Sequence, residues 1–431
     1  MAENLALRAC SISRIMWPVK STELYRQLLG IVAPWTVERV DLDASAQKID
    51  VYLEHQEGHR WACPECEKTC GLHDHAEERV WRHLDSCQFH TFVHARVPRV
   101  QCRDHGVRLV RVPWAEAGSR FTLMFEALAV AVLKEASVSG AAKLLGVTWD
   151  EAHGIMERAV RRGLAAREEV DPRVIGVDEK CVGRGPRFFT LVCDHISKRI
   201  VYIADGRGKD SLESFFEMLE PYQLVRIEAM AMDMSKAYIA AATECLPAPE
   251  RAIVFDRFHV MKAMNEALDQ VRREENKALL RDGDRRLVGT MHMFRYAEEN
   301  VPERYQARLE ELQASKLRTA RAWALKELLR ELWRCESLQE AEALWARWYG
   351  WATRSRLEPV KKVASMVKRH LGGILAYYKH RVTNALSEGI NSKIEWIKNT
   401  ARGYRNWDNF KTAILFHCGG LKLEKMSLRP A

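Results

Sequence analysis

Two short apolar runs, each ending abruptly on an acid, constrain the fold of this chain more than any other feature. Residues 174–177 lead into Asp178, and residues 229–232 lead into Asp233. The runs are too short for helices, so each predicts a buried strand that carries an acid at its carboxyl end. One such acid is most often a turn former, because its side chain accepts hydrogen bonds from the following backbone N–H groups. The segments that follow decide between that role and catalysis.

Those segments predict a mixed sheet with interspersed helices. Further strands are expected at residues 188–193, 199–204 and 252–255, and helices at residues 210–219 and 237–245. The predicted order is three strands, a helix, a strand, a helix and a strand, with acids at the ends of the first and fourth strands. This order resembles a ribonuclease H-like nucleotidyl-transferase core.

Length and charge indicate several domains and allow an anionic partner. With 431 residues the chain is too long for one ordinary core, and 47% hydrophobic residues suffice for several. Lysine and arginine number 67 against 58 aspartates and glutamates. The resulting net charge of +9 fits a polyanionic partner as well as it fits an ordinary basic soluble protein.

Cysteine usage and hydropathy predict a cytoplasmic protein. The 11 cysteines are an odd number, and no signal peptide is recognisable, so disulfides are not expected and the compartment is expected to be reducing. The most apolar window, residues 123–133, is short and contains Glu126, so no membrane span is expected. Residues 1–20 show no clear period and are expected to be partly disordered, with Met16 as an alternative start.

Two short motifs predict a structural zinc site. Cys63-Pro-Glu-Cys66 and Cys102-Arg-Asp-His105 repeat the same gap of two residues, and the long loop between them can form a small β subdomain. Each motif supplies two ligands from one tight turn, which suits tetrahedral zinc, and four protein ligands leave no open position for catalysis. The fourth ligand stays open, because other candidates lie inside the loop: Cys70, His73, His75 and Cys87.

A helix-turn-helix is predicted after this subdomain. A helix at residues 121–135 precedes residues 137–148, where Ala141 and Ala142 permit close helix crossing and Gly146 makes the turn. Thr148 starts the second helix with a capping box that ends at Glu151. Such a helix would lie in a major groove, whereas the alternative is a plain helical hairpin inside a larger core. The DNA-binding candidates on it are Thr148, His153, Arg158, Arg161 and Arg162.

The second half of the chain predicts an all-α insertion followed by a return to the core. Residues 260–379 are helical in pattern and rich in charge and tryptophan, and aromatic residues at helical spacing indicate a core, with base stacking as the alternative. Residues 383–394 predict a helix that carries Glu388. Four basic residues in and after this helix are further DNA-binding candidates: Lys393, Lys398, Arg402 and Arg405.

The acids form a candidate site for phosphodiester chemistry. In-line displacement at phosphorus needs hard divalent cations, and magnesium prefers oxygen ligands. Asp178, Asp233 and Glu388 can supply three carboxylates to a pair of magnesium or manganese ions. Asp256, at the end of the fifth strand, is a competing acid, and with His259 it is expected to support the site.

The motifs together resemble those of a known family over nearly the whole chain. They are Cys63-Pro-Glu-Cys66 with Cys102, the helix-turn-helix around Ala141 to Thr148, Val177-Asp178-Glu179, Met232-Asp233-Met-Ser-Lys-Ala-Tyr238, Asp256-Arg-Phe-His259-Val, and Ser387-Glu388-Gly-Ile-Asn391-Ser-Lys. This set resembles bacterial insertion-sequence transposases of the DDE class, in the family called ISL-three. The resemblance implies that Asp178, Asp233 and Glu388 are the catalytic triad. It also implies an enzyme that binds terminal inverted repeats and target DNA, and cuts and rejoins that DNA.

The expected fold is an α/β ribonuclease H-like core with a large all-α insertion, preceded by a zinc-binding β subdomain and a helix-turn-helix. We expect a homodimer on double-stranded DNA, associated with the nucleoid. A transcription regulator derived from a transposase and a ribonuclease H-like nuclease or resolvase are the alternatives. The predicted domains are an N-terminal segment 1–35, the zinc subdomain 36–114, the helix-turn-helix 115–168, the first part of the core 169–259, the insertion 260–380 and the C-terminal core helices 381–431.

Overall fold

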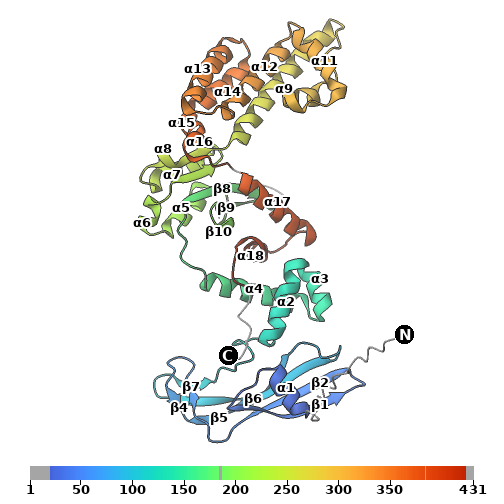
Figure 1. Ribbon diagram of the computed structural model, residues 1–431, viewed down its shortest axis with the longest axis vertical. Coiled ribbons are helices and arrows are strands. Elements are labelled where there is room, and N and C mark those ends of the chain that lie inside the picture. The colour runs from blue at the N-terminus through green and yellow to red at the C-terminus, as the bar shows by residue number, and fades with distance from the viewer. Residues whose placement is uncertain (1–19, 184–186, 384, 424–431) are drawn as a thin grey trace, which may run out of the picture. The chain divides into compact units, whose positions relative to one another are not determined.

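The computed structural model describes residues 20–183, 187–383 and 385–423, so the predictions for residues 1–19 lie outside the described residues. The chain divides into two compact units (Figure 1). Of the described residues, unit 1 holds 20–166 and 421–423, and unit 2 holds those between 167 and 420. Within the described residues, no helix is long and apolar enough to cross a membrane.

The part of unit 1 that the sequence predicts to bind zinc is built on a five-stranded sheet. Its order is β1-β2-β6-β5, with β7 paired to β6, and only β2 and β6 run parallel to each other. Valine and tryptophan side chains such as Val51, Trp81 and Val93 fill the core beneath it. The elements are α1 (Ser21–Leu28), β1 (Trp35–Asp43), β2 (Lys48–His55), β3 (Trp61–Ala62), β4 (Thr69–Cys70), β5 (Leu72–Arg82), β6 (His90–Cys102) and β7 (Gly106–Leu109).

The helical part of unit 1 has α2 (Leu123–Glu135), α3 (Val138–Leu145) and α4 (Trp149–Ala165). Side-chain oxygens cap each helix at its start: Thr122, Ser137 and Thr148 accept hydrogen bonds from backbone N–H groups three residues on. Gly146 ends α3 in the left-handed conformation at φ 65°, which makes the tight turn into α4. The capping box of Thr148 and Glu151 is present in both directions, as the sequence predicts.

Unit 2 contains a second five-stranded sheet, in the order β10-β9-β8-β11-β12. The pairs β8–β9 and β9–β10 are antiparallel, whereas β8–β11 and β11–β12 are parallel. The mixed α/β architecture and the order of the strands match the prediction, and the short helices α6 and α8 are additions to the two predicted helices. The elements are β8 (Val174–Cys181), β9 (Phe188–Asp194), β10 (Arg199–Asp205), α5 (Lys209–Glu217), α6 (Pro221–Val225), β11 (Ala229–Met232), α7 (Lys236–Cys245), α8 (Pro249–Ala252) and β12 (Ile253–Phe255).

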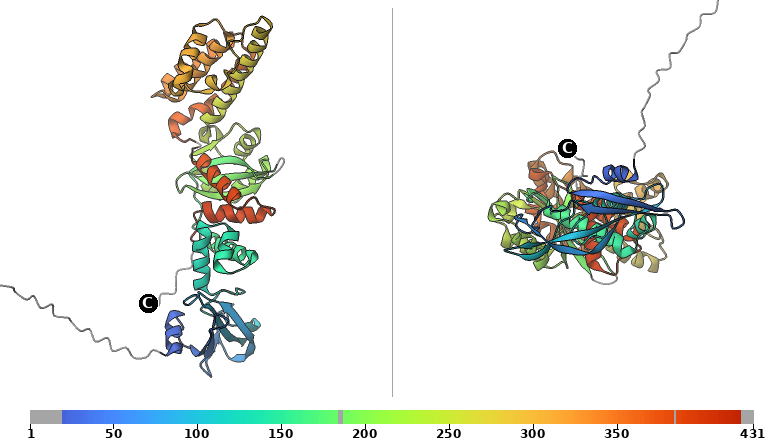
Figure 2. Two further views of the ribbon diagram at one scale, coloured as in Figure 1. Left: turned by 90° about the vertical axis from the view of Figure 1, so that its right-hand side faces the viewer. Right: turned by 90° about the horizontal axis from the view of Figure 1, so that it is seen from below.

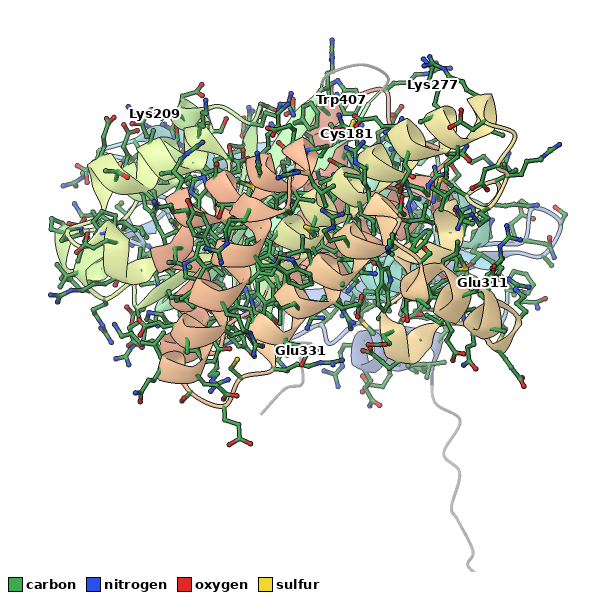
Figure 3. All side chains as sticks on the ribbon, turned by 90° about the horizontal axis from the view of Figure 1, so that it is seen from above. Cys181, Lys209, Lys277, Glu311, Glu331 and Trp407 are labelled. Atoms are coloured by element: carbon green, nitrogen blue, oxygen red, sulfur yellow. The ribbon has the colours of Figure 1, made fainter. Side chains whose placement is uncertain are left out.

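A helical domain follows β12 and shares one continuous hydrophobic core with the sheet. Trp323, Trp345 and Trp348 are buried in it, and the Trp348 Nε1 donates to the Leu325 carbonyl at 2.8 Å. Charged side chains such as Lys277 and Glu311 cover its outer surface (Figure 3). The elements are α9 (Arg257–Arg281), α10 (Met291–Arg295), η1 (Glu298–Asn300), α11 (Glu303–Ala314), α12 (Arg318–Arg330), η2 (Glu331–Trp333), α13 (Leu338–Arg354), α14 (Glu358–Arg369), α15 (Leu371–Leu375) and α16 (Tyr377–His380).

The chain then returns to the sheet through α17 (Ala385–Thr400) and α18 (Trp407–Cys418). The first of these helices packs on β8 and the second on β10 (Figure 2). Ser387 on α17 is buried, and its hydroxyl lies 3.4 Å from the Cys193 thiol of β9. The first turn of α17 is thus held against the sheet that carries Asp178.

Candidate functional site

Asp178 lies inside β8 and not at its end, which corrects the predicted strand boundary. The strand continues to Cys181 because Asp178 to Cys181 pair with β9, although the parallel pairing with β11 stops at Gly176. The Asp178 carboxylate accepts hydrogen bonds from the Glu179 backbone N–H at 2.8 Å and from Asn391 Nδ2 at 2.6 Å. Burial nevertheless raises its pKa above the ordinary value.

Asp233 directly follows β11 and faces a shallow cavity. Its Oδ1 accepts a hydrogen bond from the Ser235 backbone N–H at 3.0 Å, so it does form the turn that its position suggests. It also lines a cavity of about 450 Å³ together with Glu179 and His259. The charge of Asp233 adds to the rise in the pKa of Asp178, and that of His259 opposes it. Gly176 of β8 pairs with Ala231 of β11, so Asp178 and Asp233, each two residues further on, lie near each other at this end of the two strands.

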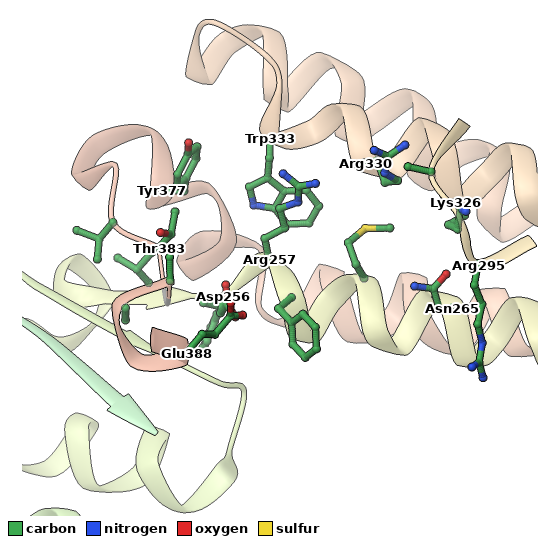
Figure 4. A pocket seen from close by; sticks show the side chains of 18 of the residues that line it. Asp256, Arg257, Asn265, Arg295, Lys326, Arg330, Trp333, Tyr377, Thr383 and Glu388 are labelled. Atoms are coloured by element: carbon green, nitrogen blue, oxygen red, sulfur yellow. The ribbon is translucent and has the colours of Figure 1, made fainter. Parts of the chain in front are cut away.

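The third predicted acid, Glu388, lies in the first turn of α17 and is exposed. It lines a different, larger cavity, which it shares with Asp256 (Figure 4). In the described part of the chain, the ligand atoms of Asp178, Asp233 and Glu388 do not form one metal-sized cluster. The structure thus brings the first two acids together and leaves Glu388 beside the competing acid.

Asn391 is the residue near this site that the prediction did not assign a role. It lies three residues after Glu388 on α17, and its amide is bound to Asp178. Lys180 of β8 strengthens the attachment of α17 to β8, because its Nζ lies 3.0 Å from the Glu395 carboxylate. The spacing of Ser387, Asn391 and Glu395, each four residues apart, is the signal that these side chains share one face of a helix.

The zinc site has the geometry of a tetrahedron. The ligand atoms of Cys63, Cys66, Cys102 and His105 all lie within 4.8 Å of one another. The Sγ atoms of Cys66 and Cys102 are 3.7 Å apart, and His105 Nδ1 is 3.8 Å from Cys63 Sγ and 3.6 Å from Cys102 Sγ. With metal bonds of about 2.3 Å to sulfur and 2.0 Å to nitrogen, the edges of a zinc tetrahedron are about 3.5–3.8 Å. The four residues therefore fit a structural zinc ion.

Local hydrogen bonds prepare these ligands for the metal. The backbone N–H of Asp104 lowers the pKa of the Cys102 thiol to about 7, and that of His105 acts in the same direction. Cys70, one of the rival ligands, donates instead from its thiol to the Lys68 carbonyl at 3.3 Å. Thiolate character at Cys102 suits a metal ligand.

The arginines of α4 have different surroundings from one another. Arg158 donates to the Glu126 carboxylate of α2 at 2.9 and 2.6 Å, and Arg162 reaches the same carboxylate at 3.2 Å. Glu126 is only 2% exposed, so it needs these partners. Arg161 is exposed. The contacts hold Arg158 and Arg162 to the helix packing and leave Arg161 as the arginine open to a ligand.

The other candidates on α4 are part of its local structure. His153 is buried and stacks on Trp149, with ring centroids 4.9 Å apart, and burial lowers its pKa. Thr148 provides the helix cap. Thr148, Trp149 and Asp150 are exposed at the start of the helix. This end of α4 is exposed and carries two acids in its first turn, Asp150 and Glu151.

Comparison with known proteins identifies the family. Residues 175–414, more than half of the chain, match the model of the ISL3-type DDE transposase domain, described as a transposase. Residues 110–160 match the helix-turn-helix domain of transposase family ISL3, and residues 59–105 match the zinc-finger of transposases IS204, IS1001, IS1096 and IS1165. This chain belongs to the ISL3 family of transposases.

Two relatives extend the likeness to nearly full length. The transposase for insertion sequence element IS1001 of Bordetella parapertussis is 28% identical over 396 residues, which are 90% of this chain and 97% of that protein. The transposase for insertion sequence element IS1557 of Mycobacterium tuberculosis is 27% identical over 420 residues, covering 90% and 93%. The prediction of a DNA-binding insertion-sequence transposase, an enzyme that cleaves and transfers DNA, is confirmed.

The basic residues near the C-terminus of the transposase are only partly available to DNA. Lys393 donates from Nζ to the His417 carbonyl at 2.6 Å, and Lys398 lies 3.8 Å from the Glu395 carboxylate. Arg402 and Arg405 are exposed in the turn between α17 and α18. A DNA contact from this region would therefore come first from the two arginines.

Proposed function

We propose that the transposase cleaves DNA at the site formed by Asp178 and Asp233, with Glu388 as the third acid and magnesium or manganese as the cofactor. The observation that carries this proposal is the register of β8 and β11: Ala231 pairs with Gly176, so the half-buried Asp178 and Asp233, each two residues further on, lie side by side. Two close carboxylates repel each other, and burial makes that repulsion costly unless a cation is present. The donor set fits a hard divalent cation, because each of these groups offers carboxylate oxygens.

In this proposal the reaction consists of two displacements at phosphorus. Water attacks the phosphodiester at a transposon end and breaks its bond to the 3′-oxygen, which frees a 3′-hydroxyl. That hydroxyl then attacks a phosphodiester of target DNA, forms a new P–O bond and displaces the 3′-oxygen of the target strand. A bound divalent ion supplies electrostatic stabilisation of the attacking and leaving oxygens. Asp178 and Asp233 hold and orient the cation, Asn391 fixes the position of Asp178, and His259 and Asp256 support the site from the start of α9.

Glu388 joins the other acids in the complex with DNA and metal. Support comes from Asn391, which lies one turn further along α17 and already touches Asp178. Glu388 and Asn391 are three residues apart, so their side chains are neighbours on the surface of α17. A small rotation or shift of this helix therefore brings Glu388 toward Asp178. Asp256 is the alternative third acid, because it follows β12 at the same edge of the sheet and shares a cavity with Glu388.

We also propose a ribonuclease H-like fold for the core, inverted-repeat DNA as the ligand of unit 1, and a homodimer as the active assembly. The strand order β10-β9-β8-β11-β12, with antiparallel and parallel halves, supports a ribonuclease H-like core. We keep the predicted domain ranges up to residue 420 and assign residues 421–423 to unit 1. The helix-turn-helix and zinc subdomain bind the terminal inverted repeats, a homodimer pairs the two ends, and the exposed Arg161, Arg402 and Arg405 contact phosphates.

The test is metal-dependent nicking of a labelled duplex that carries one terminal repeat of the element. Asp178→Asn and Asp233→Asn are expected to lower the nicking rate roughly a thousandfold, because each substitution removes a charge that holds the cation. Binding of the same duplex is measured in parallel and is expected to persist. Glu228→Gln is the matched control, since this exposed acid lies near the opposite end of β11. Nicking by either aspartate variant at the wild-type rate would contradict the assignment.

A further inference from the structure

A cavity of about 530 Å³ lies between the sheet edge and the helical domain (Figure 4). Its lining comes from β12 and the start of α9, from helices α10 and α12 with η2, and from the segment that leads into α17. Asp256 and Glu388 lie on its side toward the sheet. The volume falls in the range of about 300–1,000 Å³ that suits a small organic group, so the cavity is larger than a metal site needs.

The deeper cations of this cavity are already neutralised inside the protein. Arg330 is buried and paired with the carboxylates of Glu299 and Glu327. Lys326 is 1% exposed, and its Nζ donates to the carbonyls of Phe294 and Tyr296. These two side chains hold the helical domain together, and their charges are not available to a ligand.

Two other cations are available. Arg257 and Arg295 line the cavity and are exposed, and in the described ranges neither is paired with a carboxylate. The guanidinium of Arg257 lies 6.0 Å from the ring centroid of Trp333. Guanidinium groups bind phosphate through parallel hydrogen bonds, so these arginines favour a phosphate-bearing ligand.

The rest of the lining provides flat apolar surface and one unsatisfied polar group. Trp333 and Phe258 both line the cavity, and Phe258 is 57% exposed although it is large and apolar. Asn265 projects from α9, and its buried Oδ1 has no hydrogen-bond partner among the described residues. A buried acceptor without a donor calls for a group that the chain does not supply. An asparagine amide matches the hydrogen-bonding edge of a nucleobase.

We propose that this cavity holds one unstacked nucleotide of the DNA strand next to the cleavage point. The base lies against Trp333 and Phe258 and is hydrogen-bonded by Asn265, and the adjoining phosphates are bound by Arg257 and Arg295. Aromatic stacking and arginine–phosphate contacts are the usual means of holding an unpaired nucleotide. This inference rests on the proposed cleavage site, because Asp256 and Glu388 at the cavity place the DNA strand there.

The experiment uses the full-length transposase and duplexes that span one transposon end, each with a single 2-aminopurine near the cleavage point. No divalent metal is added, so unstacking is observed without cleavage. We expect fluorescence to rise at one position when the wild-type protein binds. Arg257→Ala and Asn265→Ala are expected to lower occupancy of the unstacked state about tenfold, because each removes a phosphate or base interaction that holds the nucleotide. Arg281→Ala, at the far end of α9, is the matched control and should behave as the wild type.

The outcomes separate this inference from the proposed active site. A rise at no position, or an equal rise with all variants, overturns the inference, whatever the nicking assay shows. A rise that depends on Arg257 and Asn265 supports it, even if Asp178→Asn still nicks DNA and the active-site proposal fails. A free nucleotide offers the same base and phosphate groups and could occupy the cavity in place of a nucleotide of the DNA strand. Binding of 2-aminopurine riboside monophosphate is therefore measured alone. Variant-dependent binding of that nucleotide without any unstacking in the duplex would overturn the DNA assignment.

Discussion

The zinc site and the acid site of this transposase are assembled in opposite ways. The zinc ligands come from two tight turns, and their atoms already lie within 4.8 Å of one another. The acids come from β8, β11 and α17, and among the described residues the structure places only Asp178 and Asp233 of the three together. Neighbouring residues on a turn are positioned by the local backbone, whereas acids on separate elements depend on how those elements pack. The zinc ligands are therefore already assembled in the protein alone, whereas we propose that metal and DNA complete the acid site.

The pKa shifts of the candidate metal ligands also differ between the two sites. At the zinc site, backbone N–H groups lower the pKa of Cys102 to about 7, which favours the form that binds metal. At the acid site, burial raises the pKa of Asp178, and Asp233 adds to that rise. Local hydrogen bonds thus favour the metal-binding form of Cys102, whereas burial disfavours the charged form of Asp178, which in our proposal a bound cation stabilises.

Removing zinc is expected to have the largest effect on folding. Structural zinc contributes about 10–16 kcal/mol of apparent binding free energy in small zinc domains, so its loss should unfold the zinc-binding part of unit 1. Cys63→Ser, or a strong chelator, should abolish the unit 1 transition in calorimetry and leave that of unit 2. Cys87→Ser is the control, because Cys87 is exposed and outside the cluster. An unchanged unit 1 transition without zinc would show that the site does not stabilise the fold.

Substitution of Glu126 tests whether the stability of unit 1 also depends on the buried ion pairs of this residue with Arg158 and Arg162. Glu126→Gln leaves Arg158 and Arg162 without their shared carboxylate, and removal of one partner of a buried pair typically costs about 3–5 kcal/mol. The measurement is urea unfolding of the zinc-saturated protein. Arg161→Ala should change stability by less than about 0.5 kcal/mol, since its side chain is exposed.

We expect the same network to decide which arginines of α4 bind DNA. An arginine that binds a phosphate contributes about 0.9 to the slope of log affinity against log salt, so its removal should make that slope shallower by this amount. Arg161→Ala is expected to do so, and Arg158→Ala is not. The measurement is a titration of terminal-repeat DNA at several salt concentrations. An equally shallow slope for Arg158→Ala would show that its pair with Glu126 opens on DNA.

His83 is expected to give a smaller, pH-dependent effect. Burial, reinforced by the charge of Arg82, lowers its pKa to about 4, and its Nδ1 lies 2.8 Å from the Thr122 hydroxyl. The folded protein therefore keeps His83 neutral while the unfolded chain takes up a proton below about pH 6.5. The contribution of neutral His83 to the free energy of unfolding is fully present above about pH 6.5. It is lost as the pH drops toward 4, and the loss amounts to up to about 3 kcal/mol. His83→Gln should reduce this fall in denaturant unfolding at saturating zinc, and an identical pH dependence in the variant would exclude the histidine as its cause.

The sequence predicted local features well, because they depend on short spacings. The two-residue gaps identified Cys63, Cys66, Cys102 and His105, and short apolar runs identified the strands of the second sheet. Contacts between distant residues were not predictable. The pattern of α4 is the same whether Arg158 faces DNA or Glu126, and only the packing of α2 against it decides. Asn391 was part of a recognised motif, yet its bond to Asp178 depends on the return of α17 across the whole helical domain.

The measurement that bears most directly on the acid site compares Glu388→Gln with Asp256→Asn in magnesium- or manganese-dependent nicking of a terminal-repeat duplex. Glu388→Gln keeps size and helix propensity, so folding and DNA binding should persist while the nicking rate falls roughly a thousandfold. Asp256→Asn should reduce the rate much less, because in this account its side chain supports the site without holding the cation. Nicking at the wild-type rate by Glu388→Gln, together with loss of nicking by Asp256→Asn, would contradict this assignment and make Asp256 the third ligand.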